Sequence, residues 1–500
     1  MATRESGPST PLAAREIAHW EAEADVVVVG LGAAGACAAI EASRAGARVR
    51  VLERAGGGGG TTAVSDGMMY FGGGTALQRA CGFEDSVEQM FRYLSASCGP
   101  EPDEARIRVY CEQAAAHYDW LVEIGVPFKA EFYPGRMLSP GEEGLTYSGN
   151  ELVHPFRDLA VPAPRAHMPQ KEGQAGALLM QKLCAEVERS GAAISTNALC
   201  DRLVVDETGR VVGVHATEAG AARNYRALRG VVLCAGGFVN NREMIRQYAP
   251  ALRKARFRAA TLGDDGRGIR MGMGAGGAAI RMSMGSVTLP FYPPKNLMRG
   301  IFVNQYGQRF MPEDVYQGRA GEIALLQQDG RVWLVLDDES FERPVFAGGE
   351  VHAAETIEEL ERELGFAAGS LQTTVALYNA GAERGEDPLF HKAAEHVAPL
   401  RTPPFGAIDL SWDKAIYAVF TLGGLATDTL ARVLNADGAP VPGLWAAGRT
   451  AASISSPGYS SGTSIGEAQI FGRIAGRSAA SADGARSEAK PSEDRKGGVN

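Results

Sequence analysis

The feature that most constrains the fold is a glycine-rich turn between a buried strand and a helix near the start of the chain. The continuous apolar run at 26–29 predicts a buried parallel strand, and the residues after it predict a helix from about 33 to 45. A second strand is expected at 48–52. The pattern G-x-G-x-x-G at 30–35 therefore lies where the first strand of a β-α-β unit meets its helix.

Each glycine of this pattern has a separate task. Gly30 allows the tight turn, Gly32 lets the backbone approach a pyrophosphate, and Gly35 lets the helix pack close to the strand. The helix N-terminus supplies amide donors for the phosphates. Glu53 ends the second strand roughly 20 positions after Gly30, where an acid accepts hydrogen bonds from a ribose hydroxyl. The pattern predicts a dinucleotide site.

The residues that follow Glu53 favour FAD over a nicotinamide cofactor. The chain enters the glycine run 56–60 and then small hydroxyl-bearing residues up to Gly67, a composition that can wrap a long cofactor. A second glycine-rich stretch at 272–277 follows a helical run and is interpreted as a helix cap and turn. The sequence therefore predicts one bound FAD and no second dinucleotide site of this type.

Composition restricts the other classes of function. The 500 residues are 45% hydrophobic and 22% charged with a net charge of −9, which is typical of a globular enzyme and disfavours nucleic acid or an anionic membrane as partner. No apolar run approaches the length of a membrane span, and the polar N-terminus lacks a signal core, so a cytoplasmic location is expected. The seven cysteines form no C-x-x-C pair, and no metal site is expected.

The pattern of expected strands, helices and glycines along the chain predicts an α/β protein with two domains. A Rossmann-like FAD-binding domain is expected to be split in sequence by an inserted α+β capping domain that holds the substrate. The expected ranges are an N-terminal tail at 1–22, the FAD-binding domain at 23–279 and 408–480, the capping domain at 280–407, and a disordered C-terminal tail at 481–500.

Several motifs together carry a family resemblance. They are the segments 54–67, 165–169, 232–238 with Asn241, 263–268, 302–310, 421–425 and 443–448. With them the chain resembles, from about residue 25 to 480, the fumarate reductase and 3-ketosteroid dehydrogenase superfamily of flavoproteins. The resemblance implies a flavin between the FAD-binding and capping domains.

Two departures from the superfamily pattern narrow the substrate. Members related to succinate dehydrogenase attach FAD through a histidine after the ribose acid, but residues 54–70 contain no histidine, so non-covalent FAD is expected. Members that reduce dicarboxylates place His and Arg near the last flavin motif. The stretch 455–464 has neither, which suits an apolar substrate with one carbonyl better than two carboxylates.

Two further segments resemble the 3-ketosteroid Δ4-dehydrogenases. Residues 458–464 match their G-Y-x-S-G-T-S, and residues 309–316 resemble their R-Y-x-P-E-D-x-Y. The resemblance implies a reaction at the C4–C5 bond of a 3-oxosteroid, in either direction, with an external electron acceptor or donor. Oligomeric state, ring-fusion stereochemistry and the distinction from Δ1 chemistry stay open.

Such a reaction needs a base for the proton beside the ketone, a hydride acceptor, and a donor for the carbonyl oxygen. Tyr459 is the expected base, with Ser461 two residues on, and Tyr316 the expected second hydroxyl. The backbone amide of Gly462 is expected to contact the substrate ketone. The residues expected to hold FAD are Gly30, Gly32, Ala33, Ala34, Gly35, Glu53, Arg54, Gly60, Thr61, Thr62, Ser65, Gly67, Ala235, Gly236, Asn241, Asp265, Gly448, Arg449, Gly462, Thr463 and Ser464.

Two alternatives remain open. One is a flavin-dependent ene-reductase for a fumarate- or urocanate-like acid, which would make Arg319 essential; a salt bridge of Arg319 with Glu313 or Glu322 is the favoured interpretation. The other is a flavin-carrying electron-transfer subunit that depends on a partner. The sequence has no C-x-x-C-H haem-attachment motif that would make it self-sufficient in that role.

Overall fold

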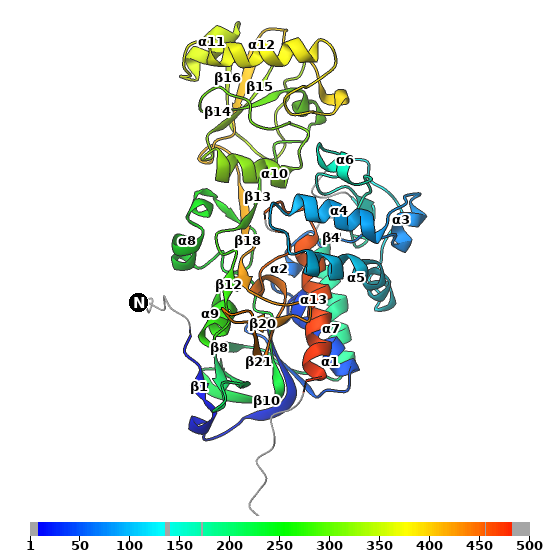
Figure 1. Cartoon of the computed structure of the whole chain (residues 1–500), viewed down its shortest axis with the longest axis vertical. Helices are drawn as coiled ribbons and strands as arrows, with labels where there is room; N and C mark the ends of the chain where they lie inside the picture. The colour runs from blue at the N-terminus through cyan, green and yellow to red at the C-terminus, as the bar shows by residue number, and fades with distance from the viewer. Residues whose placement is uncertain (1–8, 136–140, 172–173, 456, 483–500) are drawn as a thin grey trace, which may run out of the picture.

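The computed structural model describes residues 9–135, 141–171, 174–455 and 457–482. Figure 1 shows an elongated molecule with the large sheet and its helices at one end and a smaller α+β domain at the other. The expected C-terminal tail lies outside the described residues except for 481–482. No helix within these ranges is both long and apolar enough to cross a membrane.

The centre of the molecule is a parallel array of four buried strands. They are β2 (Ala22–Val29), β3 (Val49–Leu52), β10 (Ala221–Leu233) and β21 (Pro440–Ala446), in the order β21-β10-β2-β3. Val27 pairs with Val231 and with Arg50, and Leu233 pairs with Ala446. Because all four strands run the same way, their carboxyl ends meet at one edge of the sheet, where ligands bind in α/β folds.

The sheet is extended on both sides, to nine strands. On one side β7 (Ala193–Ser195) pairs parallel with β3. On the other, β8 (Ala198–Val205) and β9 (Val211–Glu218) form an antiparallel meander with β10. The expected N-terminal tail contributes β1 (Leu12–Ala13), which pairs with β8, so part of it belongs to the sheet.

Helices α1 (Ala33–Arg44), α7 (Ala175–Arg189) and α13 (Thr463–Ala480) lie together beside this sheet (Figure 1). Helices α1 and α13 pack with their backbones in contact. A Cβ added at Gly472 would lie 2.4 Å from the carbonyl oxygen of Ala34, and one at Gly476 would lie 2.2 Å from that of Ala38. Only glycine permits this approach, and it sets the starts of both helices at the edge where the strands end.

A helical lobe covers one flank of the FAD-binding domain (Figure 1). Its helices are α3 (Ala76–Ala80), α4 (Val87–Ser97), α5 (Glu104–Glu123) and α6 (Phe156–Leu159), and its small sheet has the order β4 (Met69–Tyr70), β6 (Ala166–His167), β5 (Leu145–Thr146). The short helix α2 (Gly60–Ala63) lies against α7 inside the FAD-binding domain. Two of these elements, β5 and α6, lie in the long connection between α5 and β6. A fully buried ion pair between Arg165 and Asp85, 2.8 Å apart, ties the sheet to α4.

The capping domain is inserted between β10 and β21. Its antiparallel sheet has the order β14 (Ile301–Asn304), β15 (Val332–Leu336), β17 (Phe405–Asp409), β16 (Glu350–Ala354), and α11 (Ile357–Glu363) and α12 (Ser370–Ala382) pack on it through an apolar core of their own. The predicted boundary at 407 falls inside β17. This is the split α/β fold with an α+β cap that the sequence predicts.

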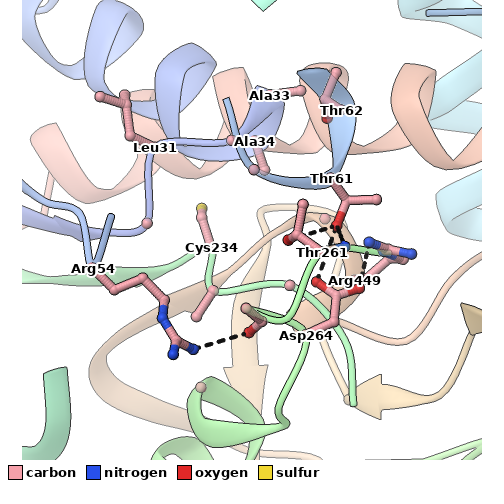
Figure 2. A pocket seen from close by; sticks show the side chains of 18 of the residues that line it. Leu31, Ala33, Ala34, Arg54, Thr61, Thr62, Cys234, Thr261, Asp264 and Arg449 are labelled. Atoms are coloured by element: carbon pink, nitrogen blue, oxygen red, sulfur yellow. Dashed lines mark hydrogen bonds and ion pairs between the residues drawn. The ribbon is translucent and has the colours of Figure 1, made fainter. Parts of the chain in front are cut away.

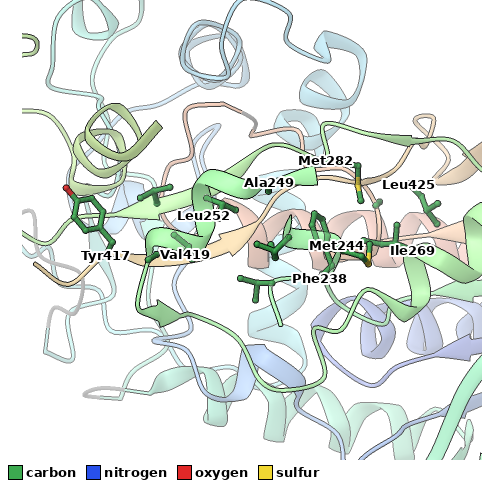
Figure 3. Packing of buried hydrophobic residues seen from close by; sticks show 14 of the residues in the cluster. Phe238, Met244, Ala249, Leu252, Ile269, Met282, Tyr417, Val419 and Leu425 are labelled. Atoms are coloured by element: carbon green, nitrogen blue, oxygen red, sulfur yellow. The ribbon is translucent and has the colours of Figure 1, made fainter. Parts of the chain in front are cut away.

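The chain enters and leaves the cap through paired strands. β13 (Gly285–Thr288) runs out and β18 (Ala418–Thr421) returns antiparallel to it. Figure 3 shows Val419 and Leu425 in one buried cluster with Leu252, Ile269 and other apolar residues of the FAD-binding domain. This shared core fixes the root of the cap.

The remaining elements are short. They are η1 (Ala14–Glu16), α8 (Arg242–Tyr248), η2 (Pro250–Lys254), β11 (Phe257–Arg258), α9 (Arg267–Gly274), β12 (Ala279–Ile280), η3 (Lys295–Arg299), α10 (Gln317–Glu322), the π-helical turn η4 (Ile323–Gln327), η5 (Ala394–His396), β19 (Gly424–Leu425), β20 (Arg432–Leu434) and η6 (Gly448–Thr450). The expected cap and turn at 272–277 is confirmed, because α9 ends at Gly274 and Gly276 has a φ of +95°.

A buried cluster of four charges organises the cap just before Tyr316. Arg309 pairs with Glu313 and with Asp387, each at 2.7 Å, and Lys392 pairs with Glu313 at 2.7 Å. The charges balance, so each buried ion keeps its partners. The cluster fixes the turn from which α10 and Tyr316 emerge.

Candidate active site

A cavity of about 640 Å³ opens at the edge where the parallel strands end. Figure 2 shows Ala33, Ala34 and Thr62 along one side of it, with Asp264 and Arg449 across from them. The predicted cofactor residues that line it are Gly30, Gly32, Ala33, Ala34, Glu53, Arg54, Gly60, Thr61, Thr62, Ser65, Ala235, Gly236, Asp265, Gly448, Arg449 and Ser464. Segments far apart in sequence thus form one site.

The geometry at the three glycines of the fingerprint agrees with their expected tasks. Gly30 has a φ of +98°, and a Cβ there would lie 2.4 Å from the carbonyl oxygen of Cys234. A Cβ at Gly35 would lie 1.9 Å from the carbonyl oxygen of Gly30, so this glycine serves packing. A Cβ at Gly32 would meet only one atom, at 4.0 Å, which leaves room for a ligand. No side chain caps α1, so its first amides are available to a phosphate.

The Glu53 carboxylate is oriented by two backbone amides so that it can accept hydrogen bonds from a hydroxyl group. Its Oε2 accepts a hydrogen bond from the amide of Leu31 at 2.7 Å, and its Oε1 accepts one from the amide of Ala55 at 2.8 Å. The side chain lines the cavity although the residue is only 7% exposed. A carboxylate fixed in this way still has lone pairs for the hydroxyls of a ribose.

Two successive aspartates differ in role, and the sequence prediction named only the second. Asp265 forms an ion pair with Arg54 at 2.9 Å at the partly exposed rim. Asp264 is buried, which raises its pKa; it pairs with Arg449 and accepts a hydrogen bond from Thr61 at 3.4 Å. Thr261 and Phe420 also line the cavity and were missed. Nothing in a single sequence distinguishes the buried aspartate from its neighbour.

Five predicted cofactor residues do not line the cavity. Gly35 serves packing, and Gly67 lies against α7, where a Cβ would be 2.5 Å from the amide of Gly176. Asn241 caps α8 and donates to the carbonyl oxygen of Asp265. Gly462 and Thr463 begin α13: a Cβ at Gly462 would meet Tyr70, and the Thr463 hydroxyl donates to the carbonyl oxygen of Ser460. These residues support the wall rather than face the cavity.

The site fits FAD. Uncapped helix amides suit the pyrophosphate, the oriented Glu53 suits the ribose, and the apolar side chains of the lining, among them Phe420 and Ile465, suit a flat apolar ring. When bound, FAD would supply a two-electron acceptor or donor.

Tyr459 lines the cavity and lies edge-on to Phe420, with ring centroids 5.3 Å apart. Its hydroxyl oxygen accepts hydrogen bonds from the amides of Gly462 and Ser464, each at 3.3 Å. Burial raises the pKa of Tyr459 to about 12, and the two amide donors oppose that rise. The Gly462 amide that we expected at a substrate ketone is therefore engaged with Tyr459.

Tyr316 and Ser461 come together from different domains. Tyr316 lies at the start of α10 in the cap, and its hydroxyl is hydrogen-bonded to the hydroxyl of Ser461, which precedes α13. Tyr316 is buried, which raises its pKa well above the usual value, while the bond to Ser461 opposes the rise. The three residues expected to be catalytic thus occupy one region, Tyr459 and Ser461 being two residues apart.

Arg319 has a protein partner. It pairs with Glu322 at 2.8 Å, as favoured from the sequence, while Glu313 pairs elsewhere. Glu322 also accepts a hydrogen bond from the amide of Gly458 at 2.9 Å, and burial raises its pKa despite Arg319. The cation nearest in sequence to the hydroxyls is thus neutralised within the cap.

Proteins of known function or structure are similar to this chain in sequence and fold. The family described as FAD binding domain matches residues 25–465. A solved 3-ketosteroid-Δ4-(5α)-dehydrogenase of Rhodococcus jostii RHA1, in complex with 4-androstene-3,17-dione, is 43% identical with a TM-score of 0.89, covering 94% of this chain and 99% of that one.

Two curated relatives act on different substrates. The 3-oxo-5-alpha-steroid 4-dehydrogenase of Comamonas testosteroni is 29% identical over 86% of this chain and 93% of its own length. The urocanate reductase of Eggerthella lenta is 29% identical over 92% of this chain and 75% of its own. The chain therefore belongs to the FAD binding domain family, and it is a FAD-dependent oxidoreductase of the superfamily that includes fumarate reductases and 3-ketosteroid dehydrogenases.

Proposed function

We propose that this enzyme removes two hydrogens across the C4–C5 bond of a 3-ketosteroid, or adds them in reverse. The observation that carries the proposal is the contact between the Tyr316 and Ser461 hydroxyls near Tyr459, which lines the cofactor cavity, while Arg319 is already paired. The steroid complex of the relative at 43% identity supports the same substrate class.

The reaction divides into a proton and a hydride. The proton on C4 is acidified by the C3 ketone and passes to a base. Bound FAD would supply the acceptor for the hydride from C5. Tyr459 is the proposed base, because two amides donate to its oxygen and stabilise the phenolate. The hydroxyl pair Tyr316–Ser461 is proposed to donate to the carbonyl oxygen or to relay the proton.

A reductase for an unsaturated acid is the competing proposal, and the similarity to a urocanate reductase keeps it in view. It requires a cation at the substrate carboxylate, whereas Arg319 and Arg449 are each paired with an aspartate or glutamate. A partner-dependent electron-transfer subunit is the alternative from another class of protein. An external electron acceptor and a cytoplasmic location remain predictions of the sequence.

Anaerobic reduction of the bound flavin tests the proposal. A 5α- or 5β-3-ketosteroid is expected to bleach the flavin absorbance within seconds, whereas succinate leaves it oxidised, because the site offers hydroxyls rather than a free cation. Stopped-flow spectroscopy with the purified enzyme measures both. Bleaching by succinate alone, abolished in Arg319→Met, would establish the acid-reductase alternative instead.

Replacing Tyr459 by Phe is expected to lower kcat by about 10²–10⁴-fold, the usual contribution of a general base. FAD content should stay near that of the wild type, because the lost hydroxyl only accepts hydrogen bonds from Gly462 and Ser464. Steady-state turnover and flavin absorbance measure the two effects. Tyr248→Phe, on α8, is the matched control; near-normal turnover in Tyr459→Phe would remove this tyrosine from the mechanism.

The pH dependence should follow the raised pKa of Tyr459. With that pKa at about 12, the phenol carries its proton at neutral pH, so dehydrogenation gains rate as the pH rises, by roughly tenfold per unit below the pKa. The reverse reaction uses the protonated phenol and should stay flat from pH 7 to 10. Flavin reduction rates over this range measure the slope, which Tyr459→Phe should abolish.

We also propose that FAD is bound without a covalent bond, since no histidine follows Glu53 up to residue 70. Denaturation should then release all the flavin.

Glu53→Gln should raise the Kd for FAD by about 10–100-fold, because the amide nitrogen of the new glutamine cannot accept a hydrogen bond, so the amides of Leu31 and Ala55 lose one of their two acceptors. Fluorescence titration of the apoprotein measures the change, with Glu23→Gln on the exposed part of β2 as control.

A further inference from the structure

The contact between the Tyr316 and Ser461 hydroxyls joins two domains, so neither domain alone sets its geometry. Tyr316 belongs to the cap and Ser461 to the FAD-binding domain. A third part of the chain touches both. It is the segment Ser148–Glu151, which follows β5 in the helical lobe, and we call it the clamp segment.

Ser148 holds the main chain of Ser461 through two opposed hydrogen bonds. The amide of Ser461 donates to the carbonyl oxygen of Ser148 at 3.0 Å, and the Ser148 hydroxyl donates to the carbonyl oxygen of Ser461 at 2.8 Å. Ser148 is 2% exposed, so water does not compete for these bonds. The position of the Ser461 backbone is therefore set by the clamp segment.

Asn150 holds the other partner. Its side-chain oxygen Oδ1 accepts a hydrogen bond from the amide of Tyr316 at 2.9 Å, and Asn150 is 1% exposed. Tyr316 is the residue before α10, so its amide has no partner inside the helix. The Asn150 side chain supplies that partner from outside the cap and fixes the point where the tyrosine side chain begins.

The clamp segment is itself held rigidly. The Tyr93 hydroxyl accepts from the amide of Asn150 at 2.8 Å and is hydrogen-bonded to the Ser460 hydroxyl at 2.8 Å. Glu151 accepts from the amide of Gly149 at 2.9 Å and from the hydroxyl of Tyr70 at 2.8 Å. A Cβ at Gly149 would lie 2.3 Å from the Tyr93 oxygen, so no larger residue fits.

We propose that Asn150, together with Ser148, is a positioning residue that brings the Tyr316 hydroxyl of the cap onto the Ser461 hydroxyl of the FAD-binding domain. This inference rests on the proposed function, in which that pair serves the substrate carbonyl or the proton relay. Asn150 acts through the Tyr316 backbone and touches neither hydroxyl. Because a displacement of about 1 Å can cost roughly 10²-fold in rate, its loss should be visible in catalysis.

Asn150→Leu keeps the size of the side chain and removes the acceptor. The expected result is a fall in kcat of about 10–100-fold on a 3-ketosteroid, with KM and FAD content within roughly threefold of the wild type. Asn150→Asp retains an oxygen toward Tyr316 and should recover most of the loss. Asn379→Leu is the matched control: this cap residue also bridges backbone groups, at Leu400, but does not touch the hydroxyl pair.

A double-mutant cycle separates positioning from general stability. In a Tyr316→Phe background the hydroxyl is gone, so Asn150→Leu should lower kcat by less than about threefold further. The inference is overturned if the falls in kcat from Asn150→Leu and Tyr316→Phe multiply fully in the double variant. It is also overturned if Asn150→Leu alone is as active as the wild type. If Asn150→Leu does not bind FAD, Ser148→Ala takes its place in the cycle with the same criterion.

The two proposals fail in different ways. A wild-type enzyme whose flavin stays oxidised with every 3-ketosteroid overturns the proposed function and this inference with it. A wild-type enzyme that turns over, combined with a multiplicative cycle, overturns the inference alone.

Discussion

The close contact between α1 and α13 is the constraint on which both ends of the active site depend. Gly472 and Gly476 let the two helix backbones touch, as Gly30 and Gly35 let α1 touch the strand turn before it. The starts of α1 and α13 therefore lie at the same edge of the sheet. One start offers amides to the cofactor phosphates, and the other offers amides to the Tyr459 oxygen, so one packing arrangement serves both the cofactor site and the residue proposed as the base.

The second constraint is the seam between the cap and the rest of the molecule. The cap is joined to the FAD-binding domain by a shared core around β13 and β18. Tyr316, the cap residue that we propose for the reaction, lies beyond β13, just before α10. Across that seam the contacts are polar: Tyr316 with Ser461, Asn150 with the Tyr316 amide, and Glu322 with the Gly458 amide. Directional bonds of this kind fix distances more narrowly than apolar packing does, which suits a hydroxyl pair built from two domains.

The sequence predicted those parts of the fold and site that follow local patterns. Spacing and composition were enough to predict the strand–glycine–helix motif, Glu53 and the inserted capping domain, whereas they left the partner of Arg319 open between Glu313 and Glu322. The sequence could not show that Asp264, and not the predicted Asp265, is the buried aspartate, because burial depends on how distant loops pack in the fold. Asn150 could not be found at all, since its partner is 166 positions away and the surrounding stretch has no periodic pattern.

Magnitudes also support the proposal of a ketone rather than a carboxylate substrate. To bind one, Arg319 would have to leave Glu322, whose side chain is 8% exposed and would keep only the Gly458 amide. Breaking a buried pair costs about 3–5 kcal/mol, with the lower value apt here because Arg319 is 30% exposed. One new charged hydrogen bond returns about 1.5–3 kcal/mol, so the exchange does not gain. In the proposed reaction the ketone needs only a neutral hydrogen-bond donor, which the Tyr316–Ser461 pair would provide without breaking an ion pair.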